Sequence, residues 1–432
     1  MSLTVDICAY DGPDCTGGPY MWIQRMPCEL RELGYRVRVR LFTWQEPEAG
    51  AAFKVLKAKG IEVAAARFAD TATNVRWLLS LAQRDPPDVF VANHVIPALH
   101  AGKFLRRWGI PTVGVLRSDD DFYRAVANSF VCGPRASRVA GLVCVSEFLK
   151  SSILSRNPTT GLVLKRIPSG TPIPAEQVAP PREVLRLAYV GRFVEEQKRA
   201  SALVQALCRV VREVHDVEAI LIGDGPARAS MEAIIAAQQT DRVKILGHLD
   251  GDTVQRQLLD SHVIVLLSDY EGTPTAVMEA MACGCVPVSL RIRSGIPELV
   301  EHGVNGLLVN DRDDDFVSAI RRLRDDLALW ASLSCAARAK VESGFSTKWA
   351  AENWAALIDE LANVRRSKRS LHIPPWFSLP PVHPTLAHQD QRAPTFWQRS
   401  VHIMKRSRFH AGKLKRRLRW HPSNPKDTAP QA

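Results

Sequence analysis

The segment SDYEGTPTAVMEAMACGCVPV, Ser268 to Val288, combines hydroxyl, glycine and acidic residues directly after an apolar run that predicts a strand. Thr273 and Pro274 predict a helix start, with a hydroxyl as N-cap and proline at the first helical position. Gly284 predicts where this helix ends. The free N–H groups near Thr275, together with the helix dipole, form a site that suits a phosphate.

Two carboxylates flank the start of this predicted helix. Glu279 lies further along it, where a carboxylate accepts hydrogen bonds from a diol such as ribose. Glu271 and Gly272 lie in the loop before it, from which Glu271 could reach a different part of the same ligand. The alternative is an amphipathic helix with one exposed glutamate and no ligand.

A second candidate segment, YVGRFVEEQKR at Tyr189 to Arg199, also follows a predicted strand. Arg192 and Lys198 could converge on a diphosphate, the first through its two-pronged guanidinium and the second as a point charge. Cations placed there would stabilise a departing phosphate. The alternative is a pair of surface cations with glutamate partners. Gly223, in LIGDGP, is a weaker signal that lets a ligand approach the backbone.

The first half of the chain carries a fourth group of candidates. Gly18, with Gly17, lies in the loop between the first predicted strand and a helix, where a diphosphate or an acceptor can approach the backbone. His94 follows another strand, and an imidazole there could bind a sugar hydroxyl. A structural histidine is the alternative. Arg117 and the acidic run Asp119 to Asp121 follow a further strand, and three adjacent carboxylates raise the question of a divalent metal.

The elements that must position these residues alternate between short β-branched runs and helical stretches over about the first 360 residues, the pattern of parallel sheets built from βαβ units. The predicted strands of the first half are Leu3 to Cys8, Arg36 to Phe42, Asp88 to Ala92, Thr112 to Leu116 and Gly141 to Val145. Those of the second half are Leu185 to Val190, Glu218 to Ile222, Val243 to Leu246, His262 to Leu267, Val286 to Ser289 and Gly306 to Val309.

The chain is therefore expected to form two Rossmann-like halves. Helices are expected between the strands, for example Met21 to Leu33. The proline-rich stretch Pro168 to Pro181 fits neither a helix nor a central strand and predicts a linker. Because ligands in open parallel sheets bind beyond the carboxyl ends of the strands, all four groups of candidates should face one cleft. The folded part is expected to end near the helix Thr347 to Asn363.

Composition excludes several classes of protein. The 432 residues are 46% hydrophobic and 24% charged, as in globular proteins, and have no apolar run long enough to span a bilayer. The first ten residues lack the features of an export signal, so we expect a cytosolic protein. No cysteine pair has zinc-site spacing, and most thiols are expected to be reduced and in the core. The net charge of +12 is concentrated between Val364 and Ala432, which carry +13, while the rest carries −1.

Taken together, these segments resemble the family 4 glycosyltransferases, retaining enzymes of GT-B fold that use nucleotide sugars. The resemblance covers about residues 3 to 362. It implies that Glu271 lies near the donor sugar and Glu279 at the ribose hydroxyls, seven residues lying between them as in the family. It also implies that Arg192 and Lys198 bind the diphosphate, although they are six positions apart where the commonest family pattern has five.

The resemblance assigns further residues. Gly18 matches the family's N-terminal glycine loop and His94 its sugar-contacting histidine, without the usual flanking histidine motif. IPSGTPIP, Ile167 to Pro174, is similar to the family's linker. RSGIPELVEHGVNGLLV, Arg293 to Val309, is similar to its donor loop, in which Gly295 and Ile296 would offer backbone N–H groups.

The expected function is the transfer of a sugar from a nucleoside diphosphate sugar to the hydroxyl of a glycan or lipid-linked glycan, with retention of configuration. Arg192, Lys198 and the helix after Thr273 would stabilise the departing diphosphate, so we expect no cofactor and no metal, although Asp119 to Asp121 and Asp313 to Asp315 each contain an Asp-x-Asp pattern. The alternatives are a nucleotide-sugar epimerase of GT-B fold, a protein that binds nucleotide sugars without turnover, and a nucleic-acid binder with a vestigial enzyme body.

The expected domain organisation follows these boundaries. Residues 1–170 form the acceptor domain, 171–182 the linker, 183–345 the nucleotide-sugar domain, 346–363 a helix returning to the first domain, and 364–432 a basic, poorly ordered tail. The tail mixes cations with aromatic residues, including Trp376, Phe377, Phe396, Trp397, Phe409 and Trp420. We expect it to bind an anionic membrane surface at the inner face of the membrane, which suits a lipid-linked acceptor. Nucleic acid is the disfavoured partner, and a solubilising extension without a partner is the other alternative.

Overall fold

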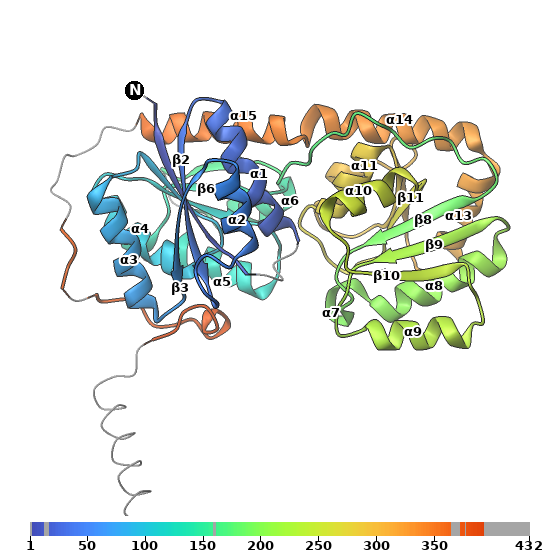
Figure 1. Ribbon diagram of the computed structural model, residues 1–432, viewed down its shortest axis with the longest axis horizontal. Helices are drawn as coiled ribbons and strands as arrows, with labels where there is room; N and C mark the ends of the chain where they lie inside the picture. Colours follow the sequence, from blue (N-terminus) through green and yellow to red (C-terminus); the bar gives the residue numbers. More distant parts are fainter. Residues whose placement is uncertain (1, 13–16, 159–160, 364–371, 376, 393–432) are drawn as a thin grey trace, which may run out of the picture.

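Two parallel sheets, each covered by helices, form the two lobes of the computed structural model (Figure 1). The structure describes residues 2–12, 17–158, 161–363, 372–375 and 377–392. Each lobe has its own apolar core, and the second lobe's core contains residues from Val178 to Phe345. The prediction of two Rossmann-like domains is confirmed.

The N-terminal sheet has seven parallel strands in the order β3-β2-β1-β4-β5-β6-β7. Their bounds are β1 Thr4–Tyr10, β2 Arg36–Thr43, β3 Glu62–Arg67, β4 Val89–Ala92, β5 Thr112–Leu116, β6 Gly141–Cys144 and β7 Val163–Arg166. Its helices are α1 Gly18–Glu32, α2 Ala51–Ala58, α3 Thr71–Arg84, α4 Ile96–Arg107, α5 Asp121–Phe130 and α6 Glu147–Leu154, with a 3-10 turn, η1, at Arg135–Ser137. The sequence analysis missed β3 and β7 and placed the other five within two residues of their ends.

The C-terminal sheet has six parallel strands in the order β10-β9-β8-β11-β12-β13. Their bounds are β8 Leu185–Val190, β9 Val217–Ile222, β10 Val243–Gly247, β11 Val263–Leu266, β12 Val286–Leu290 and β13 Leu307–Val309. Its helices are α7 Glu195–Lys198, α8 Ala200–Glu213, α9 Arg228–Ala237, α10 Gly251–Leu259, α11 Thr275–Cys283, α12 Ile296–Leu299, α13 Asp314–Asp325 and α14 Leu327–Gly344. All six strands were predicted, because each is a short apolar run bounded by turn residues.

The last long helix returns to the first lobe. Helix α15, Thr347–Ala362, follows α14 along one side of the molecule and crosses from the C-terminal lobe to the N-terminal lobe (Figure 1). Trp354 of α15 packs against Trp22 of α1, with ring centroids 5.3 Å apart. Leu357, Ile358 and Leu361 belong to the same core as β1. The two lobes are therefore joined twice, by the proline-rich linker and by the connection from α14 to α15.

The folded part does not end near Asn363, which corrects the sequence analysis. Residues 372–392 of the tail, apart from residue 376, are described and pack on the N-terminal lobe beside α3, α4 and α5; we call them the strap. Leu386, in the 3-10 turn η2 Pro384–Leu386, is 2% exposed and belongs to that lobe's core. The strap was missed because it has almost no periodic structure and is fixed by side chains distant in sequence. Trp376, Phe396, Trp397, Phe409 and Trp420 lie outside the described residues.

The cysteine thiols of the described residues are free and mostly buried, as the composition predicts. The eight cysteines of the described ranges are all free, and five of them are buried. Burial raises the pKa of the Cys144 and Cys283 thiols to about 12, so both are protonated at neutral pH. Within the same ranges, no helix has the length and hydrophobicity that crossing a membrane requires.

Candidate functional site

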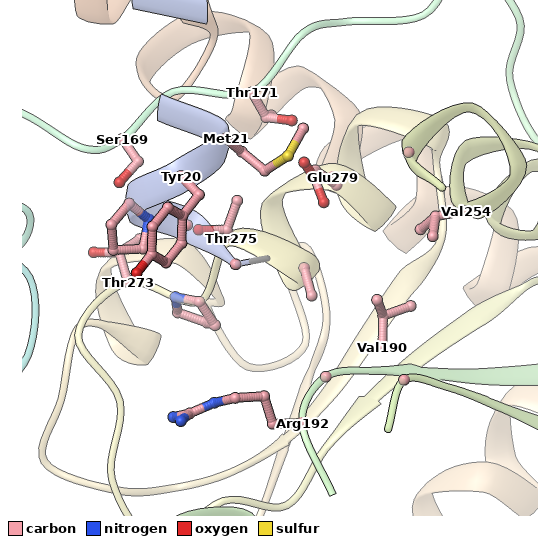
Figure 2. Close-up of a pocket in the computed structure, with 18 of the residues that line it drawn as sticks. Tyr20, Met21, Ser169, Thr171, Val190, Arg192, Val254, Thr273, Thr275 and Glu279 are labelled. Carbon is pink, nitrogen blue, oxygen red and sulfur yellow. The ribbon is translucent and has the colours of Figure 1, made fainter. Parts of the chain in front are cut away.

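A cavity of about 840 Å³ lies between the two lobes and takes lining residues from both. Helix α1 contributes Tyr20 and Met21 to this lining, and α11 contributes Thr275 and Glu279 (Figure 2). The strands of both sheets end toward this space, as expected for parallel sheets. Of the residues predicted as a site, the cavity is lined by Gly18, Arg192, Lys198, Gly223, Glu271, Gly272, Thr273, Pro274, Thr275 and Glu279.

Glu271 and Lys198 form an ion pair within the cavity. The Lys198 ammonium donates to Oε1 of Glu271, and the two side chains are 12% and 8% exposed. Lys198 is the last residue of the short helix α7, and Glu271 lies in the loop after β11, so two strand-to-helix connections bring them together. A carboxylate and an ammonium shielded in this way interact more strongly than at a surface. The pair places one positive and one negative group beside the space that a ligand would fill.

Arg192 lies after β8 and projects from the floor of the cavity (Figure 2). Its backbone carbonyl accepts a hydrogen bond of 3.0 Å from the Tyr189 hydroxyl, which fixes the loop. Its guanidinium donates to Oε1 of Gln197 over 3.2 Å, and no carboxylate within the described residues pairs with it. The Arg192 guanidinium therefore has no counter-ion among the described residues, and most of its N–H donors remain available to a ligand.

The N-terminus of α11 faces the cavity, but its cap differs from the prediction. The helix begins at Thr275, with Pro274 at the N-cap position and no side chain capping it. Thr273 is therefore not the N-cap. Its hydroxyl instead donates to the backbone carbonyl of Val145, in the opposite lobe, over 2.7 Å. The prediction failed because a threonine before a proline was assumed to bond locally, whereas an acceptor across the interface competes for it. The first N–H groups of α11 remain without a capping side chain.

Glu279 is paired across the domain boundary. Its Oε1 accepts a hydrogen bond of 3.0 Å from Nη1 of Arg25 on α1, and both side chains are 24% exposed. A ligand that donates hydrogen bonds to Glu279 therefore does so next to a cation of the other lobe. Sequence analysis missed Arg25, since nothing along α1 distinguishes it from a surface arginine.

Three glycines of the predicted site lie where a side chain would not fit. A Cβ added to Gly18 would lie 2.7 Å from Oγ1 of Thr275, so the N-terminal glycine loop touches the start of α11. Gly223 has a φ of +141° and abuts the backbone of Gly191. A Cβ on Gly272 would overlap the backbone carbonyl of Arg117. Close approach to the opposite lobe, more than turn geometry, explains glycine at both positions: Gly18 lies against the Thr275 side chain and Gly272 against the Arg117 backbone.

His94 does not line the cavity but lies behind one of its walls. Its ring meets Tyr20 edge-on, with centroids 6.4 Å apart, and Tyr20 does line the cavity. The backbone φ of His94 is +53°, a left-handed conformation that costs energy outside glycine. Burial and the neighbouring Arg117 lower the pKa of His94 to about 3, and its buried Nδ1 has no partner within the described structure. The residue is therefore a strained, neutral imidazole.

The predicted donor loop lies beside the cavity and not along its lining. A Cβ on Gly295 would overlap the carbonyl oxygen of Gly272, so the two loops are in backbone contact. The N–H of Ile296 already donates to the Ser294 hydroxyl over 3.1 Å, and the Ile296 side chain is 1% exposed. Ile296 thus begins α12 as a core residue, and its N–H is not offered to a ligand in this arrangement.

The acidic runs do not assemble into a metal site. Among the described residues, no three His, Cys, Asp or Glu side chains have the arrangement that holds a metal ion. Asp120 caps α5 by accepting from the N–H of Tyr123, and Asp119 lies against Arg124. Asp313 and Asp314 pair with Arg209 at the N-terminus of α13. Helix capping and surface ion pairs therefore account for these two runs.

The C-terminal lobe matches a known protein family. Residues 185–326 match the family model described as Glycosyl transferases group 1. The amylovoran biosynthesis glycosyltransferase AmsK of Erwinia amylovora is 35% identical over 187 residues, which are 41% of this chain and 45% of AmsK. The putative colanic acid biosynthesis glycosyltransferase WcaL of Escherichia coli K12 is 31% identical over 207 residues, 44% of this chain and 48% of WcaL. The chain spans less than half the length of these curated relatives.

Solved structures share the arrangement of both lobes. The crystal structure of Anabaena HepE in complex with UDP and glucose superposes with a TM-score of 0.67 at 20% identity, over 83% of this chain and all of HepE. The pneumococcal O-GlcNAc transferase GtfA, in complex with UDP and GlcNAc, has a TM-score of 0.66 at 12% identity, over 84% of this chain and 99% of GtfA. The predicted GT-B fold is confirmed.

Proposed function

We propose that this protein is a glycosyltransferase of family 4 that moves a sugar from a nucleoside diphosphate sugar to an acceptor hydroxyl, with retention of configuration. The observation that carries the proposal is that residues predicted independently lie around one cavity. Residues predicted from four separate segments, among them Gly18, Arg192, Lys198, Glu271 and Glu279, line one cavity between the lobes. A structural explanation would leave them on unrelated surfaces. The glycosyltransferase relatives of the C-terminal lobe support the same conclusion.

The charges of the cavity residues indicate which part of the donor each of them would bind. Arg192, Lys198 and the uncapped N-terminus of α11 surround one region and would bind the diphosphate, while Glu279 would accept hydrogen bonds from the ribose. As the bond from the sugar to the diphosphate breaks, negative charge grows on the departing phosphate, and fixed positive groups stabilise it without reorganising. The acceptor hydroxyl would attack on the same face and pass its proton to that phosphate oxygen.

The proposed reaction does not use a metal. The cations and the helix terminus of the cavity supply the charge stabilisation that a divalent ion supplies in other transferases. Transfer should therefore continue in EDTA. Loss of transfer in EDTA, with recovery on adding Mn²⁺, would refute this part of the proposal.

The acceptor is proposed to be a glycan or a lipid-linked glycan. The tail beyond the strap is strongly basic, with ten Lys and Arg and one Asp in residues 393–432. Each cation near an anionic bilayer contributes about 1 kcal/mol, so a lipid-linked acceptor would be met at the inner face of the membrane by peripheral association. The test is flotation with vesicles containing anionic lipid. Equal flotation of the full chain and a chain ending at Arg392 would remove this part of the proposal.

The decisive experiment begins with binding. A panel of nucleoside diphosphates and their sugars is screened by thermal unfolding, because a ligand that binds only the folded state raises the melting temperature. We expect stabilisation by one base series, loss of that shift in Lys198→Gln, and release of the diphosphate when an acceptor is added. A chain that binds no nucleoside diphosphate would not be a glycosyltransferase of this kind.

A further inference from the structure

Arg117 is a cavity residue to which the proposed mechanism gives no role. It directly follows β5 at the carboxyl edge of the N-terminal sheet, lines the cavity and is 9% exposed. Its backbone carbonyl touches Gly272, the neighbour of Glu271. Arg117 thus belongs to the N-terminal lobe but lies against the loop of the C-terminal lobe that is proposed to meet the donor sugar.

The guanidinium of Arg117 is held by neutral groups alone. Nε and Nη2 donate to Oδ1 of Asn93 over 3.1 and 2.9 Å, and Nη1 donates to Oγ of Ser169 over 2.9 Å. The group also stacks over the Trp22 ring at 5.0 Å. A guanidinium has five N–H donors, so these contacts leave one N–H on each terminal nitrogen. Two such donors match the two oxygens of a carboxylate.

Arg117 differs from the other basic residues of the cavity in being both buried and without a carboxylate partner among the described residues. Four Arg and Lys side chains line it, and two of them are neutralised, Lys198 by Glu271 and Arg25 by Glu279. Neither Arg192 nor Arg117 has a carboxylate partner within the described residues. Arg192 is exposed, so water solvates its charge, whereas Arg117 is buried.

The acidic run beside Arg117 does not compensate it. Asp120, which also lines the cavity, caps α5, and Asp119 lies against Arg124; among the described residues, neither carboxylate forms an ion pair with Arg117. Burial lowers the pKa of Arg117 to about 10, and the side chain still carries its charge at neutral pH. A buried charge without a counter-ion is costly, and it is favourable once a ligand supplies the opposite charge.

We propose that Arg117 binds the carboxylate of a uronic acid, and that this uronic acid is the sugar carried by the nucleotide donor. The inference rests on the proposed function. One unneutralised guanidinium matches a monoanion, which favours a carboxylate over a doubly charged phosphate ester. The backbone contact with Gly272 places Arg117 beside the loop that carries Glu271, the residue proposed to lie near the donor sugar. The chain would then transfer an acidic sugar, and Arg117 would reject the neutral analogue by leaving its own charge unpaired.

The test compares matched donors on the full chain. Once the panel of nucleoside diphosphates has identified the base, affinities are measured for that base's glucuronate and galacturonate and for its glucose and galactose counterparts. We expect the uronates to bind more tightly by at least about tenfold. Equal affinity, or tighter binding of the neutral sugars, would overturn the inference while leaving the proposed function intact. No binding of any nucleoside diphosphate would instead mean that the proposed function has failed.

Variants separate specificity from structure. In Arg117→Gln we expect the uronate preference to disappear, with affinity for the uronate donor about 100-fold lower and affinity for the free nucleoside diphosphate unchanged. Arg117→Lys should keep part of the preference. The matched control is Arg138→Gln, since Arg138 is partly buried and donates to the backbone carbonyls of Gly133 and Cys132 but lies outside the cavity lining. A variant that loses the nucleoside diphosphate but keeps the preference would show that Arg117 serves the diphosphate, against the inference.

A final arm locates the carboxylate. Free glucuronate and free glucose are titrated in the presence of the tighter-binding nucleotide uronate, whose sugar fills the donor position, so that only an acceptor position is open to them. We expect no preference between the two. A preference for glucuronate that Arg117→Gln removes would move the carboxylate from the donor to the acceptor and overturn the assignment to the donor sugar.

Discussion

Each glutamate of the cavity is paired with a cation from a different element. Glu271 holds Lys198 of α7, and Glu279 holds Arg25 of α1. These pairs fix the positions of both partners before a ligand arrives, so little rearrangement is needed when it binds. The proposed roles of Lys198 and Glu271 are therefore coupled, because removing either leaves the other charge poorly compensated.

Replacing Lys198 by glutamine should slow transfer by about 10²- to 10³-fold, because a fixed cation would be lost where the phosphate departs. The measurement is kcat under saturating donor, with thermal unfolding as a check of folding. Arg199→Gln is the control, since Arg199 pairs with Asp269 and is not part of the cavity lining. Equal rates in the two variants would contradict the role given to Lys198.

His262 gives a prediction at acid pH. It is 9% exposed, and its Nδ1 accepts a hydrogen bond of 2.9 Å from the N–H of Arg186, so the bond requires an unprotonated Nδ1. Burial lowers the pKa of His262 to about 4, below that of an unfolded histidine near 6.5. The unfolded state therefore binds more protons as the pH falls below 6.5, and stability is lost between pH 6.5 and 4.

The loss at pH 5 should be about 1–2 kcal/mol of unfolding free energy relative to pH 7.5. Urea unfolding at both values, for the wild type and His262→Gln, measures it. The variant should be less stable at pH 7.5 but show a smaller drop on acidification. His372→Gln, at an exposed position, is the control. A drop of the same size in His262→Gln would show that another group causes it.

At the scale of elements, the strap shows how an aperiodic segment is fixed. Asp390 is 4% exposed, accepts a hydrogen bond of 2.8 Å from the Thr71 hydroxyl at the start of α3, and lies 3.2 Å from Nε2 of His100 on α4. Arg392 donates to the same carboxylate over 2.8 Å. Burial raises the pKa of Asp390, but hydrogen bonds from His100, Arg392 and Thr71 outweigh it and lower this pKa to about 2. One buried carboxylate thus joins the strap to two helices.

Asp390→Ala should destabilise the chain by about 3 kcal/mol, because it leaves buried partners without their acceptor. Urea unfolding measures the change, and limited proteolysis should cut the strap earlier than in the wild type. The exposed Asp121→Ala is the control. Since the pKa of Asp390 is lowered, its contribution is present above about pH 4 and declines as the pH falls toward 2. Unchanged stability would mean that the strap does not support the lobe.

At the scale of the whole molecule, the lobes meet through backbone and short polar contacts. Gly272 touches the carbonyl of Arg117, Thr273 donates to Val145, and Oε1 of Glu298 on α12 accepts from the N–H of Phe148 over 3.0 Å. Arg117, Val145, Gly272 and Thr273 also line the cavity, so the first two contacts join the lobes at its edge. Contacts of this kind are lost when a side chain is inserted between the lobes.

Gly272→Ala should open the cavity, since its Cβ would overlap a backbone atom of the other lobe. We expect donor affinity to fall at least about tenfold, with a change in melting temperature too small to account for it. Small-angle scattering should show a larger radius of gyration. Gly344→Ala is the control, because a Cβ there meets nothing within 4 Å. Unchanged affinity and size would contradict the importance of this contact.

Strand prediction succeeded where apolar patterning is strong and failed where it is weak. All six strands of the second sheet are short, mainly apolar runs bounded by turns, and patterning alone locates them. The missed strands are β3, whose centre is a run of alanines in Glu62–Arg67, and β7, a four-residue strand with two cations in Val163–Arg166. Both lie at the edges of the first sheet, where pairing with a neighbour decides the conformation.

The sequence by itself determined the two lobes and the residues placed just after their strands, because strand periodicity and the geometry of parallel sheets are local properties. Only the tertiary structure decided which charges meet. The pairing of Glu279 with Arg25, the hydrogen bond from Thr273 to the other lobe and the neutral surroundings of Arg117 all join residues more than 20 positions apart. Pairing and burial depend on what chain folding brings together, and no local pattern encodes them.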